Sequence, residues 1–312
     1  MIPTRNRWSL LQRAVDCALA QRDVDLEVLI VDDGSTDGSA ERAETIADPR
    51  VRVFRRARLG VAAARNLGIE EARAPWIALL DDDDLWAPGK CRFQLDQMAQ
   101  HAAEISYTGQ VVVDESLAVK RVLEAPAPES LAGALLGSNV IGTPSSVISR
   151  RDAFLALGGF DTRFSVLADW DMWLRLCARH RAMGCPQLLV AYVEHAVNLH
   201  VLDTAAVLQE SALLRSRHQA LASASGGSFG DVNWWRWIAS SHRRAGRRGQ
   251  AASAYLRTGV RFRSPRDVAR ALAVLGGEGV MGRLGGSSLT PDPARSHEWE
   301  WLDRWTAEPL QQ

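Results

Sequence analysis

Aspartates follow two apolar runs in the first hundred residues of the sequence. Asp32 and Asp33 come directly after the run 27–31, and aspartate occupies every position from 81 to 84, directly after the run 76–80. If both runs are strands of one parallel sheet, their carboxyl ends meet at the edge where such sheets bind ligands. Carboxylates gathered there repel one another, and a divalent cation with substrate phosphates relieves that repulsion. The sequence therefore predicts a Mg²⁺ or Mn²⁺ site beside a phosphorylated ligand.

Short apolar runs alternate with helix-periodic stretches through the region that carries these aspartates. This alternation is typical of right-handed βαβ units, which build a mostly parallel sheet flanked by helices. The predicted strands are 27–31, 51–54 and 76–80, and the predicted helices are 9–21, 37–47 and 61–72.

A strand is also expected before the first helix, yet only Met1, Ile2 and Pro3 precede the polar residue Thr4. Strands usually have about five residues, and proline has no amide donor for a ladder. We therefore expect these residues to be too few to pair along a neighbouring strand. We also expect an upstream start that encodes further apolar residues of this strand.

The pattern changes after about residue 103. Short strands are expected between 107 and 122, at 143–149 and at 188–193, and helices at 151–157 and 169–178. From about residue 203 the sequence is mostly helical, with predicted helices at 205–222, 234–245, 250–260 and 299–305. This organisation predicts an α/β domain over 1–202, in two halves at 1–100 and 101–202, followed by a helical region over 203–312.

Composition narrows the class of protein. The 312 residues contain 37 basic and 37 acidic side chains, so net charge gives no reason to expect a nucleic-acid partner. The four cysteines, which have no CxxC spacing, are expected to be buried free thiols in a reducing compartment. No apolar run reaches the roughly 20 residues that cross a bilayer, and no leader is apparent, so we expect a cytoplasmic protein.

Six short motifs occur in an order that is known from one enzyme family. They are PTRNR at 3–7, VDDGSTD at 31–37, ARNLG at 64–68, LDDDDLW at 80–86, GGFD at 158–161 and DWDMWLRL at 169–176. Together they resemble the family 2 glycosyltransferases over roughly residues 1–200. The resemblance implies a GT-A fold, a Rossmann-like mixed sheet that is mostly parallel and flanked by helices, here with a C-terminal helical appendage.

The resemblance implies that the first half, residues 1–100, binds a nucleotide-diphosphate sugar, with UDP as the expected nucleotide, and a divalent Mn²⁺ or Mg²⁺ ion. Asp83 matches the metal ligand of the family's DxD motif, and His195 follows Tyr192 as does a histidine that approaches the metal or the pyrophosphate in relatives. The residues implied in nucleotide binding are Pro3, Thr4, Asn6, Asp32, Asp33, Arg65, Asp81 and Asp82. For Arg65 and its neighbour Asn66 we expect a role in the nucleotide pocket or in tying the helix to the sheet, and the alternative is the ordinary polarity of a helix surface.

The same resemblance implies a catalytic carboxylate in the second half. Asp169 matches the general base that takes a proton from the acceptor hydroxyl while the sugar inverts at its anomeric carbon. Trp170, Asp171 and Trp173 fall on the acceptor side, where the acceptor is a saccharide, a lipid-linked molecule or another hydroxyl compound, as in polysaccharide biosynthesis. The sequence departs from many relatives in having Ala168 instead of glutamate before the base. A helix N-cap is the alternative role of Asp169.

Two other functions are alternatives to the glycosyltransferase. A sugar-1-phosphate nucleotidylyltransferase also uses a Rossmann-like sheet and metal-bound phosphates, but it usually has a glycine-rich loop, and residues 3–7 contain no glycine. A catalytically inactive scaffold protein is the third reading. The tryptophans at 234, 235 and 237 are expected in a core rather than in a sugar site, and the absence of a membrane-spanning run leaves only peripheral contact with a membrane open.

Overall fold

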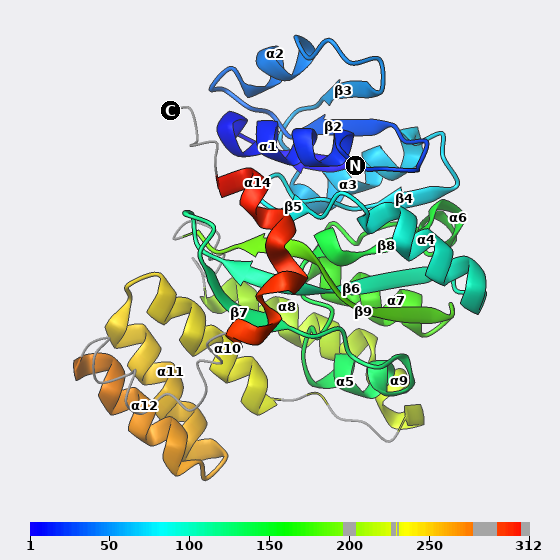
Figure 1. Cartoon of the computed structure of the whole chain (residues 1–312). Coiled ribbons are helices and arrows are strands. Elements are labelled where there is room, and N and C mark those ends of the chain that lie inside the picture. Colours follow the sequence, from blue (N-terminus) through cyan, green and yellow to red (C-terminus); the bar gives the residue numbers. More distant parts are fainter. Residues whose placement is uncertain (196–203, 226–228, 230, 277–291, 307–312) are drawn as a thin grey trace. The chain divides into compact units, whose positions relative to one another are not determined.

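The computed structural model describes residues 1–195, 204–225, 229, 231–276 and 292–306, and contacts divide the chain into two compact units (Figure 1). Unit 1 consists of Met1–Ala132, Val140–Val193 and Pro291–Gln312, and unit 2 consists of Gly133–Asn139 and Glu194–Thr290. The division differs from the predicted boundary at 202/203 chiefly because the C-terminal segment belongs with unit 1.

The first half of the sheet in unit 1 is parallel. Its strands are β1 (Ile2–Thr4), β2 (Val28–Asp32) and β3 (Val51–Arg55), in the spatial order β1-β2-β3. The expectation that so few residues cannot pair is wrong, because β1 pairs with β2 over its whole length and Pro3 lies opposite Val31. The backbone groups of successive residues in a strand point to opposite sides. The missing amide of Pro3 therefore does not affect the bonds that Thr4 makes to β2, such as the one from Asp33 N to Thr4 O at 2.9 Å.

The second half of the sheet is mixed. Its strands are β4 (Trp76–Ala78), β5 (Leu85–Trp86), β6 (Ile105–Val113), β7 (Val119–Leu123), β8 (Ile148–Arg150) and β9 (Ala182–Val193). The order is β4-β8-β6-β9-β5, with β7 beside β6; β6 and β9 are parallel, and the other pairs are antiparallel. Met1 joins the two halves, since its carbonyl accepts from Leu80 N and its amino group donates to Ala78 O. The predicted mixed sheet is thus confirmed: in the described residues β1/β2, β2/β3 and β6/β9 are parallel, and the other four pairs are antiparallel.

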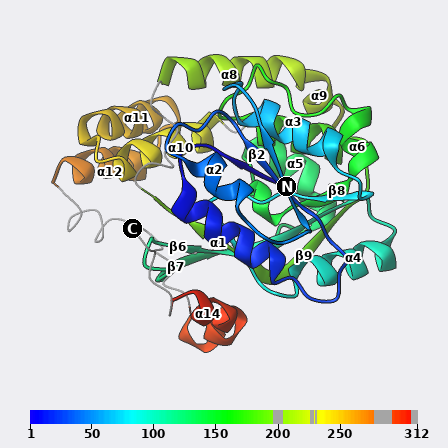
Figure 2. The same ribbon diagram turned by 90° about the horizontal axis from the view of Figure 1, so that it is seen from above.

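Helices cover both faces of this sheet. They are α1 (Trp8–Leu19), α2 (Ser39–Glu44), α3 (Val61–Glu71), α4 (Lys90–His101), α6 (Arg151–Ala156) and α7 (Ala168–Cys177), with two 3₁₀ turns, η1 (Pro128–Ser130) and η2 (Pro144–Ser146). Figure 2 shows α1 and α4 on one side and α3 and α6 on the other. The apolar stripe of α1 is buried as predicted, with Leu11 and Val15 in the core. Cys17, Cys91 and Cys185 are buried free thiols, as predicted.

The segment near the C-terminus packs on unit 1. It forms η3 (Pro293–Leu302) and α14 (Asp303–Thr306). Trp301 Nε1 donates to Leu188 O of β9 at 3.0 Å, and Leu302 and Trp305 are buried in the core of unit 1. The predicted short helix at 299–305 therefore exists, mostly as 3₁₀ helix, but it is part of the α/β unit.

Unit 2 is helical in its described residues. Its helices are α8 (Thr204–Arg217), α9 (Gln219–Ser225), α10 (Asp231–Arg244), α11 (Arg248–Arg261) and α12 (Pro265–Gly276), and the boundary between the units lies in α5 (Leu131–Gly137). The predicted helical hairpin corresponds to α10 and α11, turned at Gly246 with φ of 70°. Trp234 is buried as predicted, but its stacking partner Trp237 is 37% exposed.

A lysine lies wholly buried in unit 1 at the start of α4. Lys90 Nζ is 4.2 Å from the centre of the Trp86 ring and has no hydrogen-bond partner among the described residues. Burial lowers the pKa of Lys90 to about 8, well below that of an unfolded lysine. Below pH 8 the lysine is charged in both states, and folding has to remove that charge from water.

Replacing Lys90 by methionine is therefore expected to raise the free energy of unfolding at pH 7 by about 3 kcal/mol, the equivalent of the pKa shift. The stability advantage of the variant should shrink between pH 8 and about 10.4, because the unfolded state of the unaltered protein there holds a lysine proton that the folded state has lost. The buried thiols, whose pKa burial raises, titrate in the same range in both proteins and cancel in this difference. Urea unfolding across that pH range measures both effects. A less stable variant at pH 7 would contradict the argument.

Candidate active site

The carboxyl ends of β1 and β4 are joined by a cluster of polar side chains. Thr4 Oγ1 donates to Asp82 Oδ2 at 2.7 Å. Arg7, at the start of α1, donates from Nη1 to Asp82 Oδ1 at 3.3 Å and to Asp83 Oδ2 at 2.8 Å. The structure thus brings Thr4, Asp82 and Asp83 together as the resemblance implied. It adds Arg7, which lies within the motif at 3–7 but was not predicted as a site residue.

Burial makes this cluster electrostatically unfavourable without a further cation. Burial and then the charge of Asp83 raise the pKa of Asp82 to about 7, even though Arg7 and Thr4 favour its ionised form. Mg²⁺ and Mn²⁺ prefer such hard oxygen ligands, and Mg²⁺ commonly takes only one or two protein carboxylates with the rest from water and phosphate. The described part of the chain has no group of three or more histidine, cysteine or acidic side chains placed to hold a metal. The carboxylates nevertheless fit an ion that a bound diphosphate helps to hold.

The fourth aspartate of the run has a different environment. Asp84 is wholly buried, and its Oδ2 accepts from Thr143 Oγ1 and Ser145 Oγ, each at 2.6 Å. Its Oδ1 accepts from Val193 N at 3.2 Å. Burial raises the pKa of Asp84 well above its usual range. Asp84 therefore anchors the acidic loop to η2 and to the end of β9, a role that no sequence signal separated from those of its neighbours.

Arg65 and Asn66 extend the cluster onto α3. Arg65 is buried and donates from Nη2 to Asp81 Oδ1 at 2.6 Å, with its guanidinium 5.4 Å from the centre of the Phe160 ring. Asn66 donates to Phe160 O and accepts from Phe160 N, at 2.8 and 2.7 Å. Asn66 thus ties α3 to the segment before α7, while Arg65 neutralises the first aspartate of the run.

The loops after β1 and β2 are held by their own polar side chains. Asp33 accepts from Leu59 N and Gly60 N at 2.7 and 2.9 Å, and Asp32 Oδ2 accepts from Ser35 N at 3.0 Å. Because each carboxylate oxygen has two lone pairs, both side chains retain acceptor capacity, but Asp32 is only 2% exposed. Their contact with a base remains a prediction. Asn6, with φ of 55°, accepts from the amide of Thr36 at 2.7 Å.

The helix α7, which carries the predicted base Asp169, does not begin at that aspartate. The N-cap of α7 is Leu167, without a side-chain cap, so Asp169 is not an N-cap. Asp169 lies in the first turn, is half-buried, and accepts from Trp170 N at 2.7 Å. Asp169 thus keeps part of its surface exposed, and its role as the base remains a prediction.

The other residues assigned to the acceptor side are inside the protein. Asp171 has no exposed surface and is paired with Arg175 Nε at 2.7 Å. Trp173 is also fully buried and meets the Phe160 ring edge-on, with 6.2 Å between ring centres. Asp171 and Trp173 lie on different sides of α7, and both are buried because the helix is enclosed around most of its circumference. Neither side chain has the exposed surface that the expected contact with an acceptor needs. Trp170 keeps 7% of its surface exposed.

His195, the second predicted metal ligand, falls among the first residues of unit 2. It is half-buried and lies two residues after the end of β9. Its assignment to a metal ion remains a prediction.

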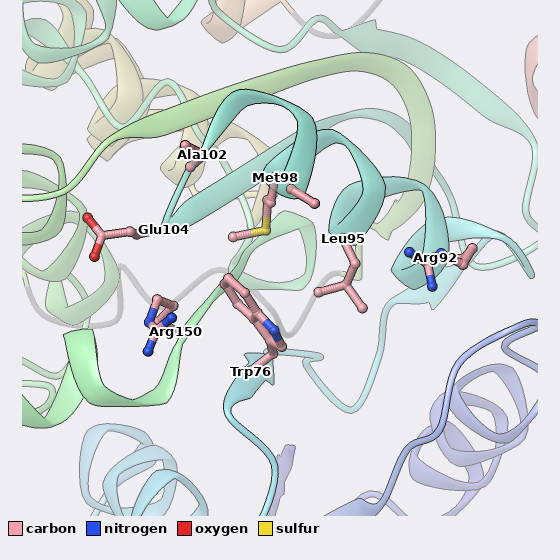
Figure 3. A pocket seen from close by; sticks show the side chains of 9 residues that line it. Trp76, Arg92, Leu95, Met98, Ala102, Glu104 and Arg150 are labelled. Atoms are coloured by element: carbon pink, nitrogen blue, oxygen red, sulfur yellow. The ribbon is translucent and has the colours of Figure 1, made fainter.

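A pocket of about 550 Å³ lies elsewhere in unit 1. It is lined by Trp76, Arg92, Leu95, Met98, Ala99, Ala102, Ala103, Glu104 and Arg150. Figure 3 shows the Trp76 ring below Met98, between Leu95 and Arg150. Trp76 begins β4, whereas the acidic run follows the other end of that strand. None of the predicted site residues lines this pocket, so it is distinct from the acidic cluster.

Known proteins resemble this chain in fold and in sequence. The structure resembles the crystal structure of S. aureus TarS 1–349 with a TM-score of 0.53 at 15% identity, over 96% of this chain and 76% of that one. The same TarS fragment in complex with UDP-GlcNAc aligns with a TM-score of 0.53 at 14% identity, over 97% of this chain and 79% of that one. At such identities the likeness shows a shared fold, and it confirms the predicted GT-A architecture of a mixed sheet flanked by helices.

Sequence relatives are bacterial. The succinoglycan biosynthesis protein ExoO of Rhizobium meliloti is 34% identical over 45% of this chain and 42% of its own length. The putative teichuronic acid biosynthesis glycosyltransferase TuaG of Bacillus subtilis is 30% identical over 61% of this chain and 76% of its own length. An uncharacterized glycosyltransferase of Rickettsia felis is 39% identical, but the match spans only 19% of that protein. The chain thus spans less than half of the Rickettsia and Rhizobium relatives.

The family itself is shown by a match to the profile of glycosyl transferase family 2, which covers residues 1–157, half of the chain. The matched residues include the acidic cluster with Thr4, Arg7 and Asp81 to Asp84, and the helix α3 that carries Arg65. Together with the relatives and the shared fold, this match shows that the chain belongs to glycosyl transferase family 2.

Proposed function

We propose that this protein is an inverting glycosyltransferase of the hexosyltransferase type. It would transfer a sugar from a nucleotide-diphosphate donor, with UDP as the nucleotide, to an acceptor hydroxyl. The observation that carries the proposal is the linkage of Thr4 and Arg7 to Asp82 and Asp83 at the carboxyl ends of β1 and β4. That is the edge at which an open α/β sheet binds its ligand.

The first half of unit 1 would bind the donor. Thr4 and Asp32 are the last residues of β1 and β2, and Asn6 and Asp33 lie on the loops that follow. Their acceptor atoms suit the N–H and O–H donors of a base and ribose. The TarS fragment, which shares this fold, has been crystallised with UDP and with UDP-GlcNAc. That protein supports a uridine nucleotide as the first donor to test here.

The acidic run would hold a divalent cation, Mn²⁺ or Mg²⁺, against the donor's diphosphate. Asp83 is the proposed ligand, with Asp81 and Asp82 beside it. When bound, such an ion supplies positive charge to the departing phosphate oxygen. Arg7 already donates to Asp83, so we expect its guanidinium to turn toward the phosphates when the ion arrives.

Asp169 would be the general base. As the acceptor oxygen forms its bond to the anomeric carbon, the bond from that carbon to the leaving phosphate oxygen breaks, and the acceptor proton passes to the Asp169 carboxylate. Attack from the face opposite the leaving group inverts the configuration. Because Asp171 is wholly buried and paired with Arg175, it is not a competing base.

A panel of nucleotide sugars with and without Mn²⁺ tests the proposal. The true donor is expected to raise the melting temperature only in the presence of the ion, because a ligand that binds the folded state stabilises it by mass action. Slow metal-dependent hydrolysis of the same nucleotide sugar should accompany the shift. Consumption of a nucleoside triphosphate with a sugar 1-phosphate would instead support a nucleotidylyltransferase, and no response to any donor would support a scaffold protein.

Replacing Arg7 by alanine is expected to lower the free energy of unfolding of the metal-free protein by about 2 kcal/mol, between the values for exposed and buried ion pairs. The loss follows because Asp82 and Asp83 lose their shared cation. Mn²⁺ with a nucleoside diphosphate should restore most of it, which thermal unfolding can measure.

Arg50→Ala is the matched control for this substitution, because the pair between Arg50 and Asp48 is exposed. Its removal should change stability by less than about 1 kcal/mol. If Arg7→Ala behaved like the control, Arg7 would not be the cation that balances the acidic run.

A further inference from the structure

Positive charge is concentrated in one part of a chain that is neutral overall. Residues 231–276, which form α10, α11 and α12, contain ten arginines, two aspartates and no lysine or glutamate. The segment therefore carries a net charge of +8, although basic and acidic residues balance in the whole chain. One of its two aspartates, Asp267, is wholly buried and paired with Arg236 and Arg270. The negative charge of Asp267 is therefore neutralised inside unit 2.

Exposed apolar side chains occur in the same three helices. In the described part of the chain eight large hydrophobic residues are exposed, and five of them lie on α10, α11 and α12. They are Trp237, Leu256, Val260, Leu272 and Leu275, with exposed fractions of 37%, 48%, 70%, 69% and 59%. Single exposed hydrophobic residues need no explanation, but a group on one surface marks a place of interaction.

The packing of α11 on α12 fixes which way these side chains point. The helices form an antiparallel hairpin around a short turn at 262–264. A Cβ on Gly259 would lie 2.5 Å from Val268 Cγ2, so Gly259 and Val268 mark the line of contact. At about 100° per residue, Leu256 and Val260 lie about 60° and 100° to one side of Gly259. Thr258, which is buried, lies about 100° to the other side.

Residues of α12 are divided in the same way by the line of contact with α11. Leu272 lies about 40° to one side of Val268, and Asp267 lies about 100° to the other side, where it bonds Arg236 of α10. Because the two helices are antiparallel, the sides away from α10 coincide. Leu256, Val260 and Leu272 therefore share one face of the hairpin, opposite α10, which we call the α11–α12 face.

Arginines border this face. Arg257 follows Val260 by about 60° around α11, and Arg266 lies on the outer flank of α12. Arg263, with φ of 50°, lies in the turn that joins the two helices. All three side chains are exposed. An apolar strip with cationic borders is the pattern of a helical surface that lies in a membrane interface.

We propose that the α11–α12 face binds the surface of an anionic lipid bilayer. The apolar side chains would enter the boundary of headgroups and acyl chains, and the arginines would contact lipid phosphates. No helix in the described residues is long and apolar enough to cross a membrane, so the contact would be peripheral. The proposal concerns unit 2 alone and does not depend on the donor, the metal ion or the proposed transfer reaction.

Sedimentation of the full chain with lipid vesicles tests this proposal. The probes are vesicles of phosphatidylcholine alone and vesicles that also contain phosphatidylglycerol. We expect binding to the anionic vesicles only, and we expect it to weaken as salt is raised because charges near the surface are screened. Equal binding to both kinds of vesicle, or to neither, would overturn the proposal.

Two triple variants separate charge from apolar insertion. Arg257→Gln with Arg263→Gln and Arg266→Gln should weaken binding by about a hundredfold, at about fivefold for each arginine removed near the surface. Leu256→Ser with Val260→Ser and Leu272→Ser should also abolish most binding without changing net charge. Since all six side chains are exposed, melting temperatures should stay close to that of the unaltered protein.

A matched control removes three exposed arginines of unit 1: Arg50→Gln, Arg92→Gln and Arg163→Gln. It changes net charge as the arginine variant does, but it should leave vesicle binding unchanged. Binding that survives the serine variant would overturn the proposal, because a surface that works by charge alone suits any polyanion, an acidic protein included. Loss of binding in the unit 1 control would overturn it as well.

Discussion

Asp169→Asn is expected to slow sugar transfer by about a hundredfold or more while leaving donor affinity unchanged, the usual effect of removing a general base. Asparagine keeps the size of the side chain and its bond from Trp170 N, but it cannot take the acceptor proton. Single-turnover transfer at saturating donor measures the loss, and calorimetric titration of the nucleoside diphosphate with Mn²⁺ measures the affinity.

Asp171→Asn is the informative comparison. Asp171 is wholly buried and pairs with Arg175, so its loss should destabilise the protein by about 3–5 kcal/mol, as breaking a buried pair does. The rate of the folded fraction should remain near that of the unaltered enzyme. Asp96→Asn, on the exposed side of α4, should change neither quantity. Transfer at a normal rate in Asp169→Asn would show that another group removes the proton.

Asp83→Ala is expected to abolish the dependence of donor binding on a divalent cation. The substitution removes the proposed ligand from a run in which Asp82 already carries a raised pKa, so the remaining carboxylates should hold the ion and diphosphate poorly. Calorimetric titration with a nucleoside diphosphate and Mn²⁺ should show at least about a tenfold weaker affinity, equivalent to about 1.4 kcal/mol.

The control for Asp83→Ala is Asp152→Ala on α6, where the carboxylate is exposed and paired with Arg150. This variant should bind the donor as the unaltered protein does. Asp83→Ala also releases Arg7, so its melting temperature must be measured to show that it is folded. Unchanged affinity in a folded Asp83→Ala protein would remove Asp83 from the metal site.

The sequence predicted the first half of unit 1 well. The strands β2 and β4 are short apolar runs, β3 alternates valine with arginine at its start, and helix-periodic stretches lie between them, so local pattern and final fold agree. The acidic run was recognisable because four aspartates directly after an apolar strand have few structural uses. The motifs, which occur in a fixed order, gave the family, and the profile match over residues 1–157 agrees.

Several elements were overlooked or misplaced because their partners are distant in sequence. The helices α4 and α12 were not predicted, although both carry a periodic buried stripe. The strand β1 was judged too short, but three residues suffice when all of them pair with β2 and the preceding residue, Met1, bonds to Ala78 and Leu80. The C-terminal segment was grouped with the helices before it, whereas Trp301 and Trp305 pack on β9.

The sequence by itself determined which side chains could do chemistry, since residue type and order along the strands decide which groups reach one edge of the sheet. Only the tertiary structure decided what each side chain does there. Helical periodicity placed Asp169 and Asp171 on different sides of α7 but could not say which side meets the core, because both are flanked by tryptophan. It likewise gave no reason to separate Asp84, a buried anchor, from Asp83. The side chains that bury a residue or bond to it can be distant in sequence, as Val193 is from Asp84. Local sequence does not predict such a contact.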